Sequence, residues 1–455
     1  MFTSLFLEEG IRFKKNKKID MISIIAFSLL FVASVAFFTI NAKKLRRNIL
    51  LGRDLTINDN KTDRWMTMIR VALGQSKMVV RPLSASMHLL VYVGFVLINI
   101  EVLEMLLDGF TGKHRIFSFL GGFYNLLIGF FEFLALGVFI GVVVFWLRRN
   151  VGKIKRFLSN DLNGFPRLDA NIILMAEIVM MSALFLMNAA DQNLQLRGNE
   201  HYHNAGSFPI SGFLAPLLAG LNDASLMLIE RICWWIHIVG IFAFLNYLPY
   251  SKHLHIILAF PNTYYSNLNA KGKFKNLASV TDVVKPNFDP SYQPIMDPNA
   301  PQRFGAKDIF DLSWKQLLDS YTCTECGRCT SSCPQNITGK LLSPRKIMMS
   351  TRDRATEVGK NIDANGGAFK DDGKSLLGNY ITPEEIWACN TCNACVQECP
   401  VNIDPLAIIM DLRQFLVMEQ STAPAELNGM FTNIENNGAP WQFAQADRLN
   451  WAKEA

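Results

Sequence analysis

The chain has 455 residues, of which 50% are hydrophobic and only 18% are charged, whereas roughly a quarter of the residues are charged in an average soluble domain. This composition excludes an ordinary soluble enzyme. Residues 1–255 carry 26 Lys and Arg against 17 Asp and Glu, and residues 256–455 carry 19 against 22. The net charge of +6 therefore gives no reason to expect nucleic-acid binding; it combines a basic membrane half with a mildly acidic, water-soluble half.

Five long apolar segments follow the N-terminal segment 1–20. A helix needs about 20 apolar residues to cross a hydrocarbon core of about 30 Å, and each segment is long enough. Five such segments within 255 residues predict a helical transmembrane bundle over 21–260. The predicted helices lie near 21–40, 83–107, 120–147, 168–190 and 228–252.

The basic residues of the loops predict the orientation of this bundle. Loops 41–82 and 148–168 carry ten and six Lys and Arg, and loops 101–116 and 191–225 carry two and one. The rich loops are expected in the cytoplasm, which puts the N-terminus outside and the C-terminal half inside. The basic segment 1–20 favours the opposite orientation, but the two rich loops together carry more Lys and Arg. We therefore expect a multi-pass protein of a bacterial cytoplasmic (inner) membrane.

Histidines on the predicted helices are candidate haem ligands. His88 lies near the inner end of the second helix, and His237 and His255 lie 18 positions apart on the fifth. If that helix is continuous, these two share one face about 27 Å apart, and His253 points about 160° away, towards the surface. Two neutral imidazoles on facing helices are the axial ligands that a b haem needs. The alternative for each is a structural histidine at the membrane interface.

The run Pro249-Tyr-Ser-Lys-His-Leu-His-Ile256 resembles the end of the fifth helix in the cytochrome b subunit of respiratory nitrate reductase. This resemblance implies that His255 ligates a haem and that His237 matches a second ligand 18 residues earlier. The family has two histidines ten apart in its second helix; His88 matches the first, but Ile98 stands at the second position. We expect one haem b between His88 and His255, and no second haem at His237 unless another residue substitutes.

For the other polar residues of the membrane half, the sequence gives only candidate roles. Glu132 and Glu177 interrupt apolar segments and are candidates for proton or quinone contacts, with helix–helix polar pairing as the alternative. Cys233 is expected to be a packing residue. His201 and His203 are expected to be solvated in an outer loop.

Eight cysteines dominate the second half, after a proline-rich stretch at 261–305 that reads as an extended linker. The run C-x2-C-x2-C-x3-C-P occurs twice, which is the bacterial signature of two [4Fe–4S] clusters in which the fourth cysteine of each run ligates the other cluster. Zinc is the alternative for grouped cysteines, and disulfides are excluded in a reducing cytoplasm. The predicted ligands are Cys323, Cys326, Cys329 and Cys399 for cluster one, and Cys389, Cys392, Cys395 and Cys333 for cluster two.

The runs are separated by 55 residues, with Leu-Ser-Pro-Arg after the first run and Ile-Asp-Pro-Leu after the second. This pattern resembles the α-helical ferredoxin domain of heterodisulfide reductases, which the resemblance places at 306–420. In fused members of that class, Cys-Cys-Gly repeats that hold the substrate-reducing cluster follow this domain. No cysteine follows Cys399, so such a module is expected on a separate chain or is absent, and the tail 421–455, with Trp441 and Trp451, is a candidate docking segment.

Together these features predict an all-α, membrane-bound oxidoreductase subunit with two [4Fe–4S] clusters and one haem b. The resemblance implies that it relays electrons between a soluble partner, such as electron-transfer flavoprotein or a Cys-Cys-Gly subunit, and menaquinone or ubiquinone in the lipid membrane. The direction of flow stays open, and no substrate pocket motif stands out. The alternatives are the membrane subunit of a quinol-linked disulfide or sulfite reductase, and a haem-free membrane anchor for a ferredoxin domain.

Overall fold

The computed structural model describes residues 2–270, 272–274, 276–294 and 303–453. The described residues form helices and loops, with two isolated β-bridges and no named strand, as the all-α prediction requires. The chain divides into two compact units. The first comprises Met1–Arg47, Asn60–Ser266 and Tyr321–Gly327, and the second comprises Asn48–Asp59, Asn267–Ser320 and Arg328–Ala455.

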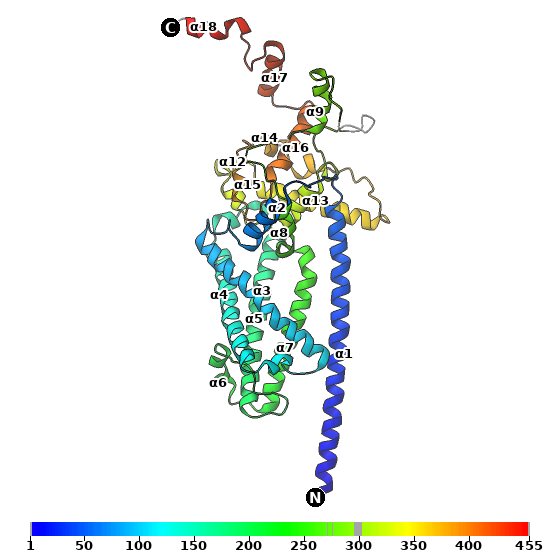
Figure 1. Ribbon diagram of the computed structural model, residues 1–455, viewed down its shortest axis with the longest axis vertical. Helices are drawn as coiled ribbons and strands as arrows, with labels where there is room; N and C mark the ends of the chain where they lie inside the picture. The colour runs from blue at the N-terminus through cyan, green and yellow to red at the C-terminus, as the bar shows by residue number, and fades with distance from the viewer. Residues whose placement is uncertain (1, 271, 275, 295–302, 454–455) are drawn as a thin grey trace. The chain divides into compact units, whose positions relative to one another are not determined.

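The first unit is a helical bundle in which α3, α4, α5 and α7 lie together (Figure 1). In the described residues, five helices are long and apolar enough to cross a membrane. Each of these helices contains an 18-residue apolar stretch with at most two charged residues. Such a stretch suits lipid, because a helix bonds its own backbone groups internally. The helices of this bundle are α1 (Phe2–Ile49), α3 (Pro82–Thr111), α4 (Gly122–Asn150), α5 (Phe165–Leu196) and α7 (Asp223–Tyr247).

Small residues allow the membrane helices to pack closely. A Cβ atom added at Gly94 of α3 would lie 2.3 Å from the Val138 side chain of α4. A Cβ at Gly109 would lie 2.7 Å from the ring of Phe27, which also packs against Trp234 and Phe242 of α7. Because lipid tails supply no hydrophobic drive between helices, close van der Waals contact of this kind holds the bundle together.

The fifth predicted helix is shorter than expected. α7 ends at Tyr247, and a 3₁₀ turn at Leu248–Tyr250 leads to Ser251, whose backbone is extended (φ −110°, ψ 149°). A second 3₁₀ turn follows at Lys252–Leu254, and His255 begins a separate helix, α8 (His255–Tyr264). The prediction that His237 and His255 share one face of a continuous helix is therefore wrong, because the helix breaks next to Pro249.

The second unit is built from shorter helices. Ser343-Pro344 and Asp404-Pro405 begin α13 (Pro344–Ala364) and α16 (Pro405–Met418), and each cap side chain accepts a backbone N–H from the first turn. A Ser or Asp cap followed by proline at the first helical position is a strong start signal, so the repeated x-Pro motif of the two runs marks two equivalent helices. The predicted linker 261–305 contains α8 and α9 (Ala278–Val284), and part of it lies outside the described residues. The other helices of eight or more residues are α2 (Lys61–Met68) of the first unit, and α10 (Trp314–Thr322) and α17 (Ala425–Asn437).

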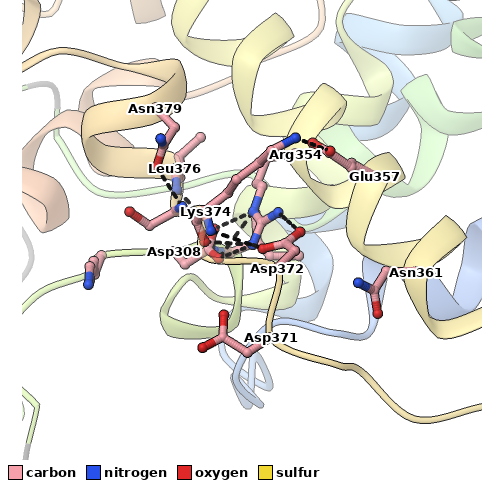
Figure 2. A network of polar contacts seen from close by, with 12 residues as sticks. Asp308, Arg354, Glu357, Asn361, Asp371, Asp372, Lys374, Leu376 and Asn379 are labelled. Atoms are coloured by element: carbon pink, nitrogen blue, oxygen red, sulfur yellow. Dashed lines mark hydrogen bonds and ion pairs between the residues drawn. The ribbon is translucent and has the colours of Figure 1, made fainter. Parts of the chain in front are cut away.

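A buried arginine fixes the long spacer between the cysteine runs (Figure 2). Arg354 of α13 is fully buried, and its guanidinium donates to both carboxylate oxygens of Asp308 and of Asp372, at 2.6–3.1 Å. It also donates to the carbonyl of Lys374 at 2.8 Å, and Asp308 accepts the backbone N–H of Leu376 at 3.0 Å. One side chain thus holds the loop 363–378 against its own helix.

Candidate metal centres

The two C-x-x-C-x-x-C loops have left-handed residues at equivalent positions. In the first loop Glu325 and Gly327 have positive φ values of 55° and 72°, and in the second Thr391 and Asn393 have values of 56° and 60°. Each pair flanks the second cysteine of its run. Left-handed residues other than glycine are uncommon and are held in place where function requires them. Turns of this kind point successive backbone N–H groups towards one centre, which is how iron–sulfur sites bind their negative charge.

Four of the predicted ligands meet at one cavity in the second unit. Cys333 from the first run and Cys389, Cys392 and Cys395 from the second run all line it. The remaining wall is mostly apolar, from Leu342, Pro344, Leu406 and Ile409 among others. Four cysteine sulfurs are the donor set that a [4Fe–4S] cluster requires, and the apolar wall limits the access of solvent, so the residues present fit this group.

The sulfur atoms of these runs receive backbone hydrogen bonds. The Thr391 N–H donates to Cys389 Sγ at 3.4 Å, and the Ile403 N–H donates to Cys399 Sγ at 3.3 Å. Burial raises the pKa of the thiols of Cys389 and Cys395. Bare thiolates are therefore disfavoured here, and a bound metal would supply the missing positive charge.

Arg413 of α16 is a cation next to this cavity. Its Nη2 donates to the carbonyls of Ile386 and Cys389, at 2.7 and 2.8 Å, and its guanidinium lies 5.0 Å from the ring centre of Trp387. Its Nε is buried and has no hydrogen-bond partner among the described residues. The positive charge of Arg413 acts on the Cys389 sulfur.

The four cysteines predicted for cluster one fall in both units. Cys323 and Cys326 lie in the segment Tyr321–Gly327 of the first unit, and Cys329 and Cys399 belong to the second. Cys323 and Cys399 are buried, and the other two are partly buried. Cys233, the ninth cysteine, is buried in the apolar core of the membrane bundle, which agrees with its predicted packing role.

Three histidines gather at one end of the membrane bundle. His88 of α3 lies within electrostatic range of His253 and His255, whose ring centres are 5.5 Å apart. Burial and the neighbouring imidazoles lower the pKa of His253 to about 4 and that of His255 to about 3. His253 packs against Phe244 and is only partly exposed, so its predicted surface position is wrong.

The ring of His255 is oriented by its own turn. Its Nδ1 lies 3.1 Å from the carbonyl of Lys252, which fixes Nδ1 as the protonated nitrogen and leaves Nε2 free to ligate a metal. His237 is held in the same way, with Nδ1 3.0 Å from the carbonyl of Met180. Ile98 stands where the resembled cytochrome family has its second histidine of this helix, and it is buried in the apolar core. The residues present thus fit one haem at His88 and His255 better than one at His237.

An ion pair ties the histidine segment to the first cysteine loop within the first unit. The Lys252 ammonium pairs with Glu325, between Cys323 and Cys326, and also donates to the carbonyl of Pro166 at 2.6 Å. Burial lowers the pKa of Lys252, and the Glu325 carboxylate opposes this shift. The turn that carries His255 and the loop that carries two cysteines are therefore neighbours.

A group of buried polar residues at the opposite end of the bundle was not predicted from the sequence. Glu132, the one member that was named as a candidate, accepts hydrogen bonds from Asn188, Ser211 and Ile210. Glu177 lies apart from this group in the middle of α5. The spacing of Glu101, Glu104 and Asp108, at i, i+3 and i+7, puts them on one helix face and could have revealed the group.

Comparison with known proteins identifies the class of the cysteine domain. The family profile described as a 4Fe-4S dicluster domain matches residues 322–403. No solved structure matches the chain.

Curated relatives are iron–sulfur proteins. The chain is 29% identical to the probable iron-sulfur-binding oxidoreductase FadF of Bacillus subtilis, over 95% of this chain and 61% of that protein. It is 26% identical to the EtfAB:quinone oxidoreductase of Syntrophomonas wolfei, over 90% of this chain and 57% of that protein. A probable membrane-anchored ferredoxin of Chromohalobacter salexigens is 31% identical over 35% of this chain and 25% of that protein. The chain spans about three fifths of the length of the first two relatives, and their names are consistent with an oxidoreductase subunit.

Proposed function

We propose that this chain is a membrane electron-transfer subunit that connects a soluble redox partner with the quinone pool through two [4Fe–4S] clusters and one haem b. The observation that carries the proposal is the cavity lined by Cys333 together with Cys389, Cys392 and Cys395. It joins cysteines from both runs, as the exchanged fourth ligand of a two-cluster ferredoxin requires.

The chain's own residues would hold these groups. Cys323, Cys326, Cys329 and Cys399 would ligate cluster one, and the four cysteines of the cavity would ligate cluster two. His88 and His255 would ligate the haem, and the free Nε2 of His255 is the nitrogen available for this. When bound, these groups supply reversible one-electron transfer. The protein orients the His255 imidazole, donates backbone N–H groups to the sulfurs of Cys389 and Cys399, and lines the cavity of cluster two with apolar side chains.

The ion pair between Lys252 and Glu325 supports a continuous path. It keeps the turn of His255 beside the loop of Cys323 and Cys326. In the predicted orientation this end of the bundle and the cysteine domain lie on the cytoplasmic side of a bacterial inner membrane.

The soluble partner is proposed to be an electron-transfer flavoprotein or a separate Cys-Cys-Gly subunit. One relative is named an EtfAB:quinone oxidoreductase, and it extends well beyond the part that this chain matches. In the tail, Trp441 and Trp451 are 51% and 75% exposed, which suits a docking segment. The membrane acceptor or donor is proposed to be menaquinone or ubiquinone.

The competing function is the membrane subunit of a quinol-linked disulfide or sulfite reductase, which the heterodisulfide reductase-like motifs favour. A reductase subunit would oxidise its haem when a disulfide substrate and the partner are added, whereas a flavoprotein-linked subunit would reduce its haem with reduced flavoprotein. A haem-free anchor would show no haem spectrum under either condition.

The deciding experiment is a dithionite-reduced minus oxidised optical spectrum of the purified chain, together with iron analysis and electron paramagnetic resonance. Two clusters and one haem predict about nine irons per chain and a b-type α band. About eight irons without the band would support the haem-free anchor. Far fewer than eight irons would contradict the two clusters. Appearance of the α band when quinol is added to the oxidised protein, which means that quinol reduces the haem, would support the link to quinone.

A further inference from the structure

A buried polar network crosses the end of the membrane bundle opposite to His255. Its centre is Arg115, which follows α3 and is only 6% exposed. The guanidinium donates from Nε to Asp191 at 2.7 Å, from Nη2 to Asn188 at 2.8 Å and from Nη1 to the Tyr124 hydroxyl at 3.2 Å. Three membrane helices, α4, α5 and the end of α3, are thus joined at one cation.

Two arms extend from this centre to further carboxyl groups. On one side the Tyr124 hydroxyl donates to Glu104 at 2.7 Å. On the other side Asn188 donates to Glu132 at 3.1 Å. The result is a continuous hydrogen-bonded chain from Glu104 to Glu132. The buried polar network, as named here, comprises Glu101, Glu104, Asp108, His114, Arg115, Tyr124, Glu132, Asn188 and Asp191.

The charges of the network do not balance if every acid is ionised. It holds five carboxyl groups against one guanidinium, and His114 is the second group of the network that can carry positive charge. Four of the five carboxyl groups belong to residues that are at most 5% exposed, and Asp108 is partly buried. An unpaired charge in a membrane interior is costly, so the network must hold protons on some of its carboxyl groups.

Glu101 is the member best placed to hold such a proton. It is 95% buried and lies within electrostatic range of Glu104, Glu132 and Arg115. Among the described residues no hydrogen bond to its carboxyl group is observed, whereas Glu104, Glu132 and Asp191 each accept at least two. Burial without donors disfavours the charged form of this carboxyl group, the two neighbouring carboxylates add to this effect, and the Arg115 guanidinium opposes it.

The network also reaches the surface. His114 Nε2 lies 3.3 Å from Asp191, and its Nδ1 is buried without a partner among the described residues. The His114 ring packs on Tyr202 and lies 6.0 Å from the ring of the exposed His201. Tyr202 donates to Glu230, which pairs with Arg231, so these two charged groups lie beside the tyrosine that packs on the histidine.

We propose that this network is a proton-exchange site, in which Glu101 holds an exchangeable proton and His114 passes it to the aqueous phase. The inference rests on the proposed function, because reduction of a quinone to a quinol consumes two electrons and two protons, and oxidation releases them. Glu104 lies 16 residues from His88 along α3, or about 24 Å. Proton exchange would therefore occur at the end of the bundle away from the haem ligands.

Infrared difference spectroscopy of the purified full chain tests the site without any quinone activity. The measurement is the carbonyl stretch of protonated carboxyl groups at neutral pH, in H₂O and after transfer to D₂O. The background variant is Glu177→Gln, which removes the carboxyl group of α5 outside the network. In this background we expect a band that shifts in D₂O, and we expect it to disappear in Glu101→Gln. Glu357→Gln, at a solvent-exposed ion pair of the second unit, is the control that leaves the band unchanged.

A second variant tests the route. His114→Asn should keep the band but slow its shift in D₂O roughly tenfold. A band that is absent, that persists in Glu101→Gln, or that never shifts in D₂O would overturn the proposal and identify the network as a sealed helix clamp. An unchanged exchange rate in His114→Asn would overturn the route. Unchanged cluster signals in every variant show that the chain is folded.

The quinone assay then separates this proposal from the proposed function. Glu101→Gln should slow quinone-linked turnover roughly tenfold, while reduction of the clusters by dithionite is unaffected. If the wild-type chain shows no quinone activity, the proposed function fails, and the infrared result still decides whether the site exchanges protons. If turnover is unchanged in Glu101→Gln, the site is not coupled to quinone chemistry and the proposal is overturned.

Discussion

Cys333 and Cys395 line the same cavity, although they belong to cysteine runs that are separated by 55 residues of spacer. The shared cavity means that neither run can complete its own four-ligand set at this place. The second run needs the last cysteine of the first.

This exchange predicts which cysteine substitutions act together. Cys333→Ser and Cys395→Ser should each remove the same cluster signal and about half of the cluster iron, because both sulfurs face one cavity. Paramagnetic resonance of the reduced protein and iron analysis measure the loss. Cys233→Ser, in the membrane core, should leave iron unchanged. Loss of different clusters in Cys333→Ser and Cys395→Ser would contradict the shared site.

The oriented ring of His255 predicts the haem ligand. His255→Ala should abolish the b-type α band, whereas His253→Ala should keep it, because only His255 has its Nδ1 held by a backbone carbonyl among these two. The optical difference spectrum is the measurement, and His203→Ala, in an exposed loop position, is the matched control. The opposite pattern would assign the ligand to His253.

The position of Arg413 predicts the potential of cluster two. Reduction adds negative charge, which a nearby guanidinium stabilises, so Arg413→Gln should lower the midpoint potential. A loss on the order of 1 kcal/mol corresponds to roughly 40 mV for one electron. A redox titration followed by paramagnetic resonance measures the shift. Arg413→Lys retains the charge and should shift the potential less, and an equal shift in both variants would mean that charge is not the cause.

The Arg354 network predicts a stability difference that depends on pH. The hydrogen bonds from Arg354 lower the pKa of Asp372 below its ordinary value of 3.8. A group whose folded pKa is depressed stabilises the fold above its unfolded pKa, and this contribution is lost as pH falls through the folded pKa. Asp372 lies near the surface, where solvent screens part of the ion pair, so Asp372→Asn should destabilise the chain by about 1 kcal/mol at pH 7, and the difference should shrink below about pH 4.

Thermal loss of the iron–sulfur absorbance, followed in the wild type and in Asp372→Asn over a pH series, measures this difference. Asp371→Asn changes the exposed neighbouring carboxylate and should have little effect at any pH. A constant difference between wild type and Asp372→Asn from pH 7 to pH 3 would show that the ion pair does not titrate as described.

Local sequence patterns were sufficient to predict the helical segments and to identify the cysteines of the two runs as candidate cluster ligands. Apolar length predicted the five membrane helices, and Ser343-Pro344 and Asp404-Pro405 are start signals that act within a single turn. The position of His253 could not be predicted in this way. Its surface placement assumed a continuous helix, whereas the chain breaks at Ser251, whose hydroxyl caps the next turn and donates to Asp169.

The sequence by itself determined which candidate ligands and which membrane-length segments this protein has. These are eight cysteines at two fixed spacings, histidines near helix ends, and apolar segments of membrane length. These features are local, because a C-x-x-C loop or an apolar helix needs only its own residues to form. Tertiary structure decided which of these residues meet. Cys333 reaches the second run, and Arg115 bonds Tyr124 of α4 and Asp191 of α5, because helix packing brings together side chains whose separation along the chain gives no indication of contact.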